Sequence, residues 1–181
     1  MPTILTHAAL PLIAAWGIGP RYIPWRLAWA GVAIAVIPDL DVAGMISGVS
    51  PNSIWGHRGF SHSIIVAAVL AVVLTFTLAW RRRWSLTMVF LFLSGLSHGL
   101  TDMLTNGGRG IALLWPFDSE RIFAPIRPVK VSPILFQSIE IGKLSSALIS
   151  ELIWLAAPAL FIALFVRLLS ASYIDLPKGQ S

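Results

Sequence analysis

The chain has 181 residues, of which 56% are hydrophobic and 12% are charged, and its mean hydropathy is +0.80. Because soluble domains carry about 25% charged residues, this composition excludes a soluble globular domain and a disordered chain. Cysteine is absent, which excludes a disulfide scaffold and a thiolate metal site. The class that remains is an integral membrane protein.

The formal net charge of +5 would favour a nucleic-acid partner in a soluble protein. Here the basic residues lie in short segments between apolar runs. We therefore expect them to set the membrane topology and to contact anionic lipid headgroups. The expected partners are membrane lipids and a small-molecule or lipid substrate, with no nucleic acid.

Apolar segments predict an all-α fold, a polytopic helical membrane protein with about five transmembrane or membrane-embedded helices around a His/Asp site. Those at residues 63–80 and 84–108 are long enough to cross most of a ~30 Å hydrocarbon core. The shorter runs predict tilted or partly re-entrant helices, at residues 3–19, 27–37 and 152–166. The start of the chain lacks the positive region of a cleavable signal peptide, and we expect residues 1–181 to form one integral membrane domain.

Two connections are polar and long. One runs from Asp39 to His62, and the other spans about residues 106–144. Loops longer than about a dozen residues are usually functional or disordered. The second is rich in aromatic residues and prolines, so we expect it to be ordered and packed.

Basic turns predict the orientation of the chain. Lys and Arg concentrate on the cytoplasmic side of inner-membrane proteins, and the marks here are Arg21, Arg26, Arg81, Arg82, Arg83, Arg167 and Lys178. Placing them inside requires an odd number of spans and puts the N-terminus outside. The histidines and three of the aspartates then fall at the outer end, so we expect a multi-pass protein of the inner (plasma) membrane with an extracytoplasmic site.

His98 and Asp102 are four residues apart, which places both side chains on one face of a helix. There they can bind one metal ion or bridge two. The alternative is a polar pair that stabilises the helix. An ionisable group inside an apolar span costs about 2.5–3.5 kcal/mol and usually serves a function, which favours the metal.

Asp39 and Asp41 follow Pro38 just past a predicted helix end. One interpretation is a turn with an aspartate cap, since Pro and Asp favour such breaks. Two carboxylates this close also repel each other unless a cation or a shared proton lies between them. The second interpretation makes one a metal ligand and the other a second ligand or a general base.

The segment from His57 to Ser63 holds two histidines and one arginine. Ser61 is a candidate N-cap, and the free amides of a helix start favour an anion. Arg58 can grip a phosphate or carboxylate with two hydrogen bonds. The alternative is contact with lipid headgroups, which the density of the cluster disfavours.

Taken alone, His7 would be interpreted as an interfacial histidine. The other His and Asp candidates strengthen its interpretation as a functional residue. Imidazole with carboxylate suits Zn, Mn, Fe or Co. Three or four protein ligands leave a position for water, whose pKa a bound metal lowers toward about 7. Loop cations can hold a phosphorylated headgroup over this site or anchor the loop at the interface, namely Arg109, Arg121, Arg127 and Lys130.

Several motifs in this order resemble the YdjM-type family of LexA-regulated, inner-membrane, metal-dependent hydrolases, over residues 1 to about 155. They are Thr6-His7, Pro38-Asp39-Leu40-Asp41, His57-Arg58-Gly59-Phe60-Ser61-His62-Ser63, Ser97-His98-x-x-x-Asp102, Gly107-Gly108-Arg109-Gly110, Leu114-Trp115-Pro116-Phe117, Arg127-Pro128 and Val131-Ser132-Pro133. The resemblance implies an inner-membrane hydrolase of the SOS response.

More distantly, the pattern is similar to zinc-dependent phospholipase C and P1-type nucleases. Those helical enzymes gather an early His, an Asp, a His and an HxxxD motif around several metals. The likeness implies the same places for His7, Asp39 or Asp41, His62, and His98 with Asp102. This chain lacks a second helical HxxxE motif and further histidines, so we expect one or two divalent ions, zinc first and manganese second.

The leading hypothesis is a membrane-bound, metal-dependent hydrolase of an ester or phosphoester, with a lipid substrate favoured. The expected metal ligands are His7, Asp39, His62, His98 and Asp102. Asp41 or His57 would act as general base or second-metal ligand, and Arg58 would stabilise the anionic transition state. Arg109 and Arg127 would bind substrate. The alternatives are a metal-ion or proton transporter, and a non-catalytic membrane protein with a structural metal site.

Overall fold

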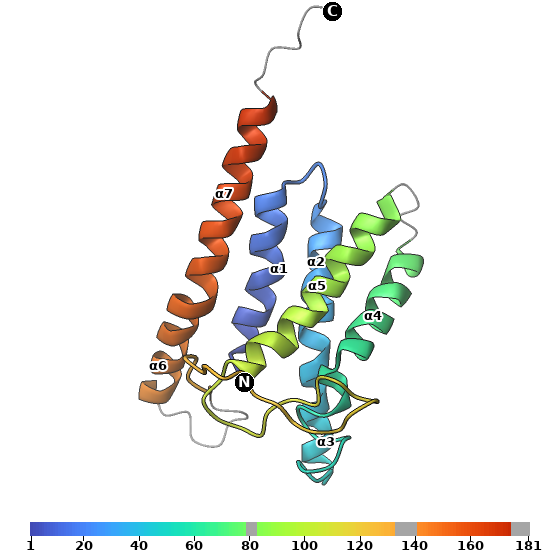
Figure 1. The fold of residues 1–181 in the computed structure, drawn as a ribbon, viewed down its shortest axis with the longest axis vertical. Coiled ribbons are helices and arrows are strands. Elements are labelled where there is room, and N and C mark those ends of the chain that lie inside the picture. Colours follow the sequence, from blue (N-terminus) through green and yellow to red (C-terminus); the bar gives the residue numbers. More distant parts are fainter. Residues whose placement is uncertain (79–82, 133–140, 175–181) are drawn as a thin grey trace, which may run out of the picture.

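The computed structural model describes residues 1–78, 83–132 and 141–174. Within these residues it is helical, with five helical rods. The rods lie side by side, and some are tilted relative to the others (Figure 1). Three rods are long and apolar enough to cross a membrane, namely Trp25–Ile46, Trp84–Met103 and Ile141–Ser170. Two shorter apolar helices, Ile4–Ile18 and Ile64–Thr77, complete the set. The predicted class, a helical membrane protein of about five helices, is confirmed.

The first two rods place polar residues at one end of the bundle. Helix α1 is Ile4–Ile18 and α2 is Trp25–Val36. The sequence predicted that this helix ends at Ile37, but the helical path continues. It continues through a 3₁₀ turn, η1 (Ile37–Asp41), into the short helix α3 (Val42–Ile46). Pro38 is tolerated there because it occupies the first turn of a helical segment, where its missing N–H has no intrahelical role.

The third and fourth rods follow η2, the 3₁₀ turn Phe60–His62. Helix α4 is Ile64–Thr77, and its N-cap is Ser63, whose hydroxyl accepts from the Val66 amide, so the prediction of Ser61 as the cap was wrong. Helix α5 is Trp84–Met103, ending five residues before the predicted boundary. The predicted end at Trp80, with Arg81 and Arg82, lies outside the described residues.

The last rod is longer than the sequence indicated. It starts with α6 (Ile141–Glu151), passes through a π turn, η4 (Leu152–Ala156), and continues as α7 (Ala157–Ile174). Residues 133–140 of the second connection and Lys178 fall outside the described part of the chain.

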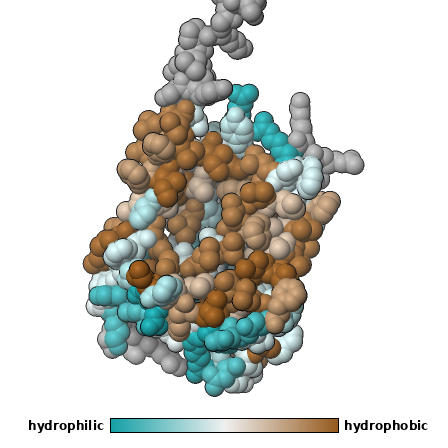
Figure 2. All heavy atoms as spheres, in the orientation of Figure 1, coloured by the Kyte–Doolittle hydropathy of each residue, from teal (hydrophilic) through white to brown (hydrophobic). Residues whose placement is uncertain are grey.

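Small residues let the helices approach closely, as is common in membrane bundles. A Cβ at Gly31 of α2 would lie 2.7 Å from the Phe90 ring of α5, and one at Gly17 of α1 would lie 2.7 Å from the Cα of Ala163 of α7. Leu27, Ile34 and Leu91 fill the core between α2 and α5. Apolar residues cover most of the visible face of the bundle, and hydrophilic ones gather toward its ends (Figure 2).

One end of the bundle is basic. The Arg83 side chain donates to the Arg21 carbonyl at 2.7 Å and lies over the Tyr22 ring. Arg167 donates to the Trp16 carbonyl at 2.7 Å and lies over the Trp16 ring. Aromatic rings and arginines together are typical of a membrane–water interface.

The connection after α5 covers the opposite end. Two isolated β-bridges, Thr105 with Val129 and Ile111 with Ile122, fold residues 104–132 back on themselves. The Ala112 amide donates to the Arg58 carbonyl at 3.1 Å, which ties this segment to the His57–His62 segment. Ile111 and Val129 are fully buried. This part of the connection therefore packs over the polar end of the helices.

Candidate metal centre

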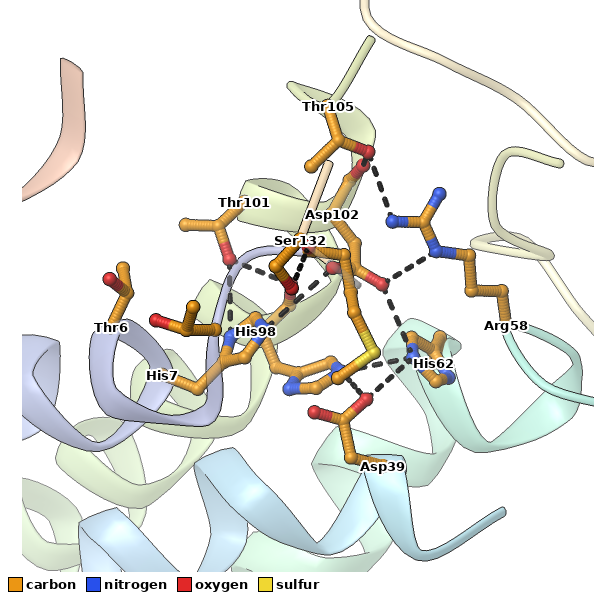
Figure 3. A network of polar contacts seen from close by, with 12 residues as sticks. Thr6, His7, Asp39, Arg58, His62, His98, Thr101, Asp102, Thr105 and Ser132 are labelled. Carbon is orange, nitrogen blue, oxygen red and sulfur yellow. Dashed lines mark hydrogen bonds and ion pairs between the residues drawn. The ribbon is translucent and has the colours of Figure 1, made fainter. Parts of the chain in front are cut away.

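The His and Asp side chains predicted from sequence converge at the end of the bundle opposite the arginines (Figure 3). His7 comes from the first turn of α1, Asp39 from η1 and His62 from η2. His98 and Asp102 come from the last turns of α5. All five are nine-tenths or more buried. Helix ends from four separate segments thus meet at one point.

The central pair is His62 with His98. Their Nε2 atoms lie 2.9 Å apart. The His98 Nδ1 lies 2.7 Å from the Ala35 carbonyl, an acceptor, so Nδ1 carries the proton and Nε2 a lone pair. The His62 Nδ1 lies 3.0 Å from Ser61 Oγ, whose own proton goes to Asp41 at 2.6 Å. Two nitrogens this close require a proton or a metal ion between them.

The other two histidines have the same arrangement. The His57 Nδ1 donates to Asp41 Oδ1 at 2.7 Å. The His7 Nδ1 lies 3.3 Å from the Thr101 hydroxyl, which itself donates to the His98 carbonyl. Among the described residues, the buried Nε2 atoms of His7 and His57 have no hydrogen-bond partner. Histidines that ligate metals typically donate one ring N–H to such an outer partner and turn the other nitrogen to the ion.

Two carboxylates face these nitrogens. Asp39 Oδ1 lies 3.5 Å from the His98 Nε2 and 3.9 Å from the His62 Nε2. Asp102 Oδ2 lies 3.4 Å from the His62 Nε2, and its Oδ1 lies 3.7 Å from the His7 Nε2. Both oxygens of Asp39 are buried and lack a hydrogen-bond partner in the described part of the chain. Carboxylate oxygens left in this state are costly unless a cation neutralises them.

Three overlapping groups bring ligand atoms within 4.8 Å of one another: His7, Asp39 and His98; Asp39, His57 and His62; and His62, His98 and Asp102. These groups contain all five predicted ligands and add His57. Asp39, His62 and His98 each belong to two groups. The donor set of buried imidazoles and carboxylates therefore fits a divalent metal. The overlap of the three groups is compatible with one ion or with two.

Charge balance gives the same result. Three aspartates (Asp39, Asp41 and Asp102) lie at the centre, and among the described residues only Asp102 forms an ion pair with an arginine, Arg58. A divalent ion would neutralise the carboxylates that lack such a partner. In the metal-free protein, burial lowers the pKa of His62, but its hydrogen bonds to Asp102 and Asp41 outweigh burial and raise the pKa to about 9. A proton on His62 then offsets part of the negative charge of these carboxylates.

Asp41 lies one step outside this group of ligands. Besides its bonds to His57 and Ser61, its Oδ2 accepts from the Arg58 amide at 3.2 Å and lies 3.4 Å from the His62 Nδ1. It thus orients two imidazoles through their Nδ1 atoms. The outer position of this carboxylate is consistent with a supporting role.

Arg58 is almost fully buried and points into the centre. Its Nε lies 3.0 Å from Asp102 Oδ2, and its terminal nitrogens donate to the Gly107 carbonyl and the Thr105 hydroxyl at 3.0 Å each. Its backbone adopts φ +67°, a left-handed conformation uncommon outside glycine. A Cβ at Gly108, where φ is +88°, would lie 2.5 Å from the Arg58 Nη1. The fold therefore fits around this side chain.

The structure does not bring the predicted substrate-binding arginines into the centre. Arg109 is exposed, and Arg127 is exposed with its guanidinium 4.7 Å from the Phe123 ring centroid. Arg121, which the sequence grouped with them, donates to the His57 and Ser53 carbonyls at 2.8 Å each. It supports the loop that carries His57.

Sequence reasoning missed the residues that orient the ligands, namely Ser61, Thr101, Thr105 and the carbonyl of Ala35. The one usable signal was spacing, because Thr101 lies three residues after His98, on the same side of α5. The others come from distant segments, so only the fold reveals them.

Comparison with known proteins identifies the family of the chain. The profile of the YdjM inner membrane protein family matches residues 1–174. The chain belongs to this family. It is 41% identical over 167 residues to inner membrane protein YbcI of Escherichia coli K12, covering 90% of this chain and 95% of that protein. It is 33% identical over 102 residues to inner membrane protein YdjM of Escherichia coli K12 and of Shigella flexneri, about half of each chain.

No solved structure matches the chain. Membership in the YdjM inner membrane protein family, together with the three candidate spans, confirms the predicted family and the predicted location in the inner membrane. Hydrolysis and LexA control, which the resemblance implied, stay predictions.

Proposed function

We propose that this protein is a membrane-bound, metal-dependent hydrolase that cleaves an ester or phosphoester of a lipid at the membrane surface. The observation that supports it most is the pair of buried Nε2 atoms of His62 and His98, 2.9 Å apart and flanked by Asp39 and Asp102. This donor set lies at one end of the bundle, beneath a folded loop. A metal or proton transporter needs polar groups along the whole membrane depth, so the placement favours an enzyme.

The ions are one or two divalent cations, zinc first and manganese second, since imidazole with carboxylate suits both. His7, Asp39, His62, His98 and Asp102 hold them, and His57 offers a sixth donor. A bound divalent ion supplies Lewis acidity, which polarises the scissile bond and acidifies water.

The chain's own residues supply orientation and proton transfer. His57 is the candidate general base, because its Nε2 is buried without a partner in the described residues while Asp41 holds its Nδ1. If a second ion binds, the same Nε2 serves as its ligand. Arg58 holds Asp102 and offsets its charge. We therefore assign Asp41 and Arg58 positioning roles in place of direct contact with the transition state.

A lipid substrate is supported by two apolar grooves beside α1. One, of about 320 Å³, lies between α1 and α7, and the other, of about 310 Å³, lies between α1 and α5. Both are lined by Leu10, Ala14 and Ile18, and the second reaches Ser97, the neighbour of His98. Their apolar lining and size suit an acyl chain.

The side of the membrane follows from charge. Arg21, Arg83 and Arg167 lie at the end opposite the metal centre. Since Lys and Arg concentrate on the cytoplasmic side, we place the centre at the extracytoplasmic face.

The experiment is to purify the protein in detergent, count its metal by mass spectrometry, and assay phospholipids and generic phosphoesters. Metal-dependent turnover that chelation abolishes and metal restores is the expected result. Stoichiometric metal without turnover across a broad substrate screen would instead favour a structural metal site. Metal-dependent flux into liposomes without turnover would favour the transporter.

A further inference from the structure

Glu151 is a buried carboxylate that the proposed reaction does not use. It lies in the apolar segment Ile141–Ser170 and is 1% exposed. A π turn begins directly after it, and the next three side chains, Leu152 to Trp154, are more than half exposed. A carboxylate inside an apolar span is costly and usually functional, so its partners indicate its purpose.

Among the described residues, three hydrogen bonds reach Glu151, and all come from the N-cap and first turn of α1. The Thr3 amide donates to Oε1 at 2.7 Å. The Thr3 and Thr6 hydroxyls donate to Oε2 at 2.5 Å each. Bonds to an ionised acceptor are short and strong. Glu151 therefore ties the last rod to the first, one residue before His7.

Helix α1 needs this carboxylate because it has no cap of its own. Its N-cap is Thr3, whose side chain makes no capping hydrogen bond, and its first turn holds no acidic residue. The first amides of a helix lack intrahelical partners, and the positive end of the helix dipole favours a negative charge. Glu151 supplies both an acceptor and a charge from another helix.

The same turn is weakly tied to the rest of α1. Pro11 lies inside the helix and has no N–H, so the His7 carbonyl loses its usual partner four residues on. The His7 ring stacks on the His98 ring, with centroids 4.0 Å apart, but its hydrogen bonding is limited to a long contact of 3.3 Å between its Nδ1 and the Thr101 hydroxyl among the described residues. The position of the His7 Nε2 thus depends on how the first turn of α1 is held.

We propose that Glu151 is a positioning residue of the metal centre, which fixes the first turn of α1 and thereby aims His7 at Asp39 and His98. This inference rests on the proposed metal site. It assigns a role to a rod that contributes no ligand among the described residues.

The test uses the full chain in detergent loaded with Co²⁺, with affinity and the visible absorption spectrum as readouts. Changing an outer partner of a ligand typically weakens metal affinity about 10–100-fold, and we expect that loss for Glu151→Ala. Its spectrum should match that of His7→Ala, and Glu151→Gln, which keeps an acceptor, should lie between Glu151→Ala and the unchanged protein. Thr6→Val, a milder change, should shift affinity in the same direction.

The control is Thr75→Val, which removes a buried hydroxyl bonded within α4 and should leave affinity and spectrum unchanged. A double change separates positioning from a general structural role. If Glu151 acts through His7, Glu151→Ala should cause no further loss of affinity in a His7→Ala background. An equal loss in both backgrounds, or no loss in either, would overturn the inference. If the unchanged protein binds no Co²⁺, it is the proposed metal site that fails.

Discussion

The Nε2 atoms of His62 and His98 lie 2.9 Å apart in a site where both rings are buried and both Nδ1 atoms face acceptors. This relationship joins η2 to α5, two segments 36 residues apart in sequence. Two nitrogens this close need a proton or a metal ion between them, which supports the proposed metal centre.

The first prediction concerns ligand loss. His98→Ala and Asp102→Ala each remove donors from the centre, so we expect each to weaken metal binding by about 100-fold or more, beyond the typical effect of an outer partner. Metal content after dialysis, measured by mass spectrometry, checks it. Ser97→Ala is the matched control, because its hydroxyl donates to the Ser94 carbonyl of the same helix, away from the ligand atoms. Full metal content in both ligand variants would rule out this ligand assignment.

The second prediction separates the two neighbouring aspartates. Asp41→Asn should weaken metal affinity about 10–100-fold, because the amide holds His57 and His62 less firmly. Asp39→Asn should weaken it more, since Asp39 faces the ligand nitrogens directly. Titration with Zn²⁺ against a competing chelator gives both values. Leu40→Ala, between them and 67% exposed, is the control. An Asp41→Asn variant as weak as Asp39→Asn would make Asp41 a ligand.

The third prediction concerns Arg58. Arg58→Ala leaves the Asp102 carboxylate buried without its ion-pair partner, which typically costs about 3–5 kcal/mol. Thermal unfolding in detergent should show a marked loss of stability, with Arg58→Lys intermediate because it keeps the charge and loses the planar fork. Gly108→Ala should also destabilise, through its positive φ and its approach to Arg58. If Arg58→Ala melts like the unchanged protein, the ion pair has no structural role.

The fourth prediction is a pH dependence. The metal-free pKa of His62 is about 9, above its ordinary value near 6.5. The proton on His62 thus stabilises the metal-free fold fully below pH 6.5, and this contribution is lost as pH rises through 9. A metal must displace that proton, so its affinity should rise with pH up to about 9.

Calorimetric titration in two buffers of different ionisation enthalpy checks the proton release at pH 7. His62→Gln should bind metal weakly and should remove this part of the pH dependence. Affinity that is constant between pH 6.5 and 9 would contradict the role of His62.

The fifth prediction tests the lipid substrate. Ala14→Phe adds a ring to both grooves beside α1, so turnover of long-chain lipids should fall while turnover of a soluble phosphoester persists. Ala33→Phe on α2, at an exposed position, is the matched control. An equal decline on both substrates would show that the grooves do not hold the acyl chain.

The ligand residues could be predicted from the sequence, but one helix boundary could not. The predicted ligands His7, Asp39, His62, His98 and Asp102 all meet at one point. They could be predicted because ionisable groups in an apolar chain are few and each one costs free energy. The boundary after Ile37 could not, because Pro38 can end a helix or begin a new turn and only packing decides between them.

The roles of Asp41 and Arg58 also lay beyond the sequence. Asp41 has the same chemistry as Asp39 and lies two residues away, yet it bonds the outer nitrogens of two rings. From sequence, Arg58 was expected to bind an anionic substrate, whereas in the structure it pairs with Asp102. Glu151 gave no signal, because its partners lie 145 and 148 residues away.

By itself, the sequence determined that the chain is a helical membrane protein and which side chains gather at one end of it. Composition and spacing suffice for this because the bilayer penalises every polar group and the helix repeats every 3.6 residues. Only the tertiary structure decided which nitrogen of each histidine faces the centre, which carboxylates face the ligand nitrogens and which orient the rings, and how α1 is held. Those choices depend on contacts between distant segments. A single hydrogen bond there decides whether a side chain faces the metal site or orients a side chain that does.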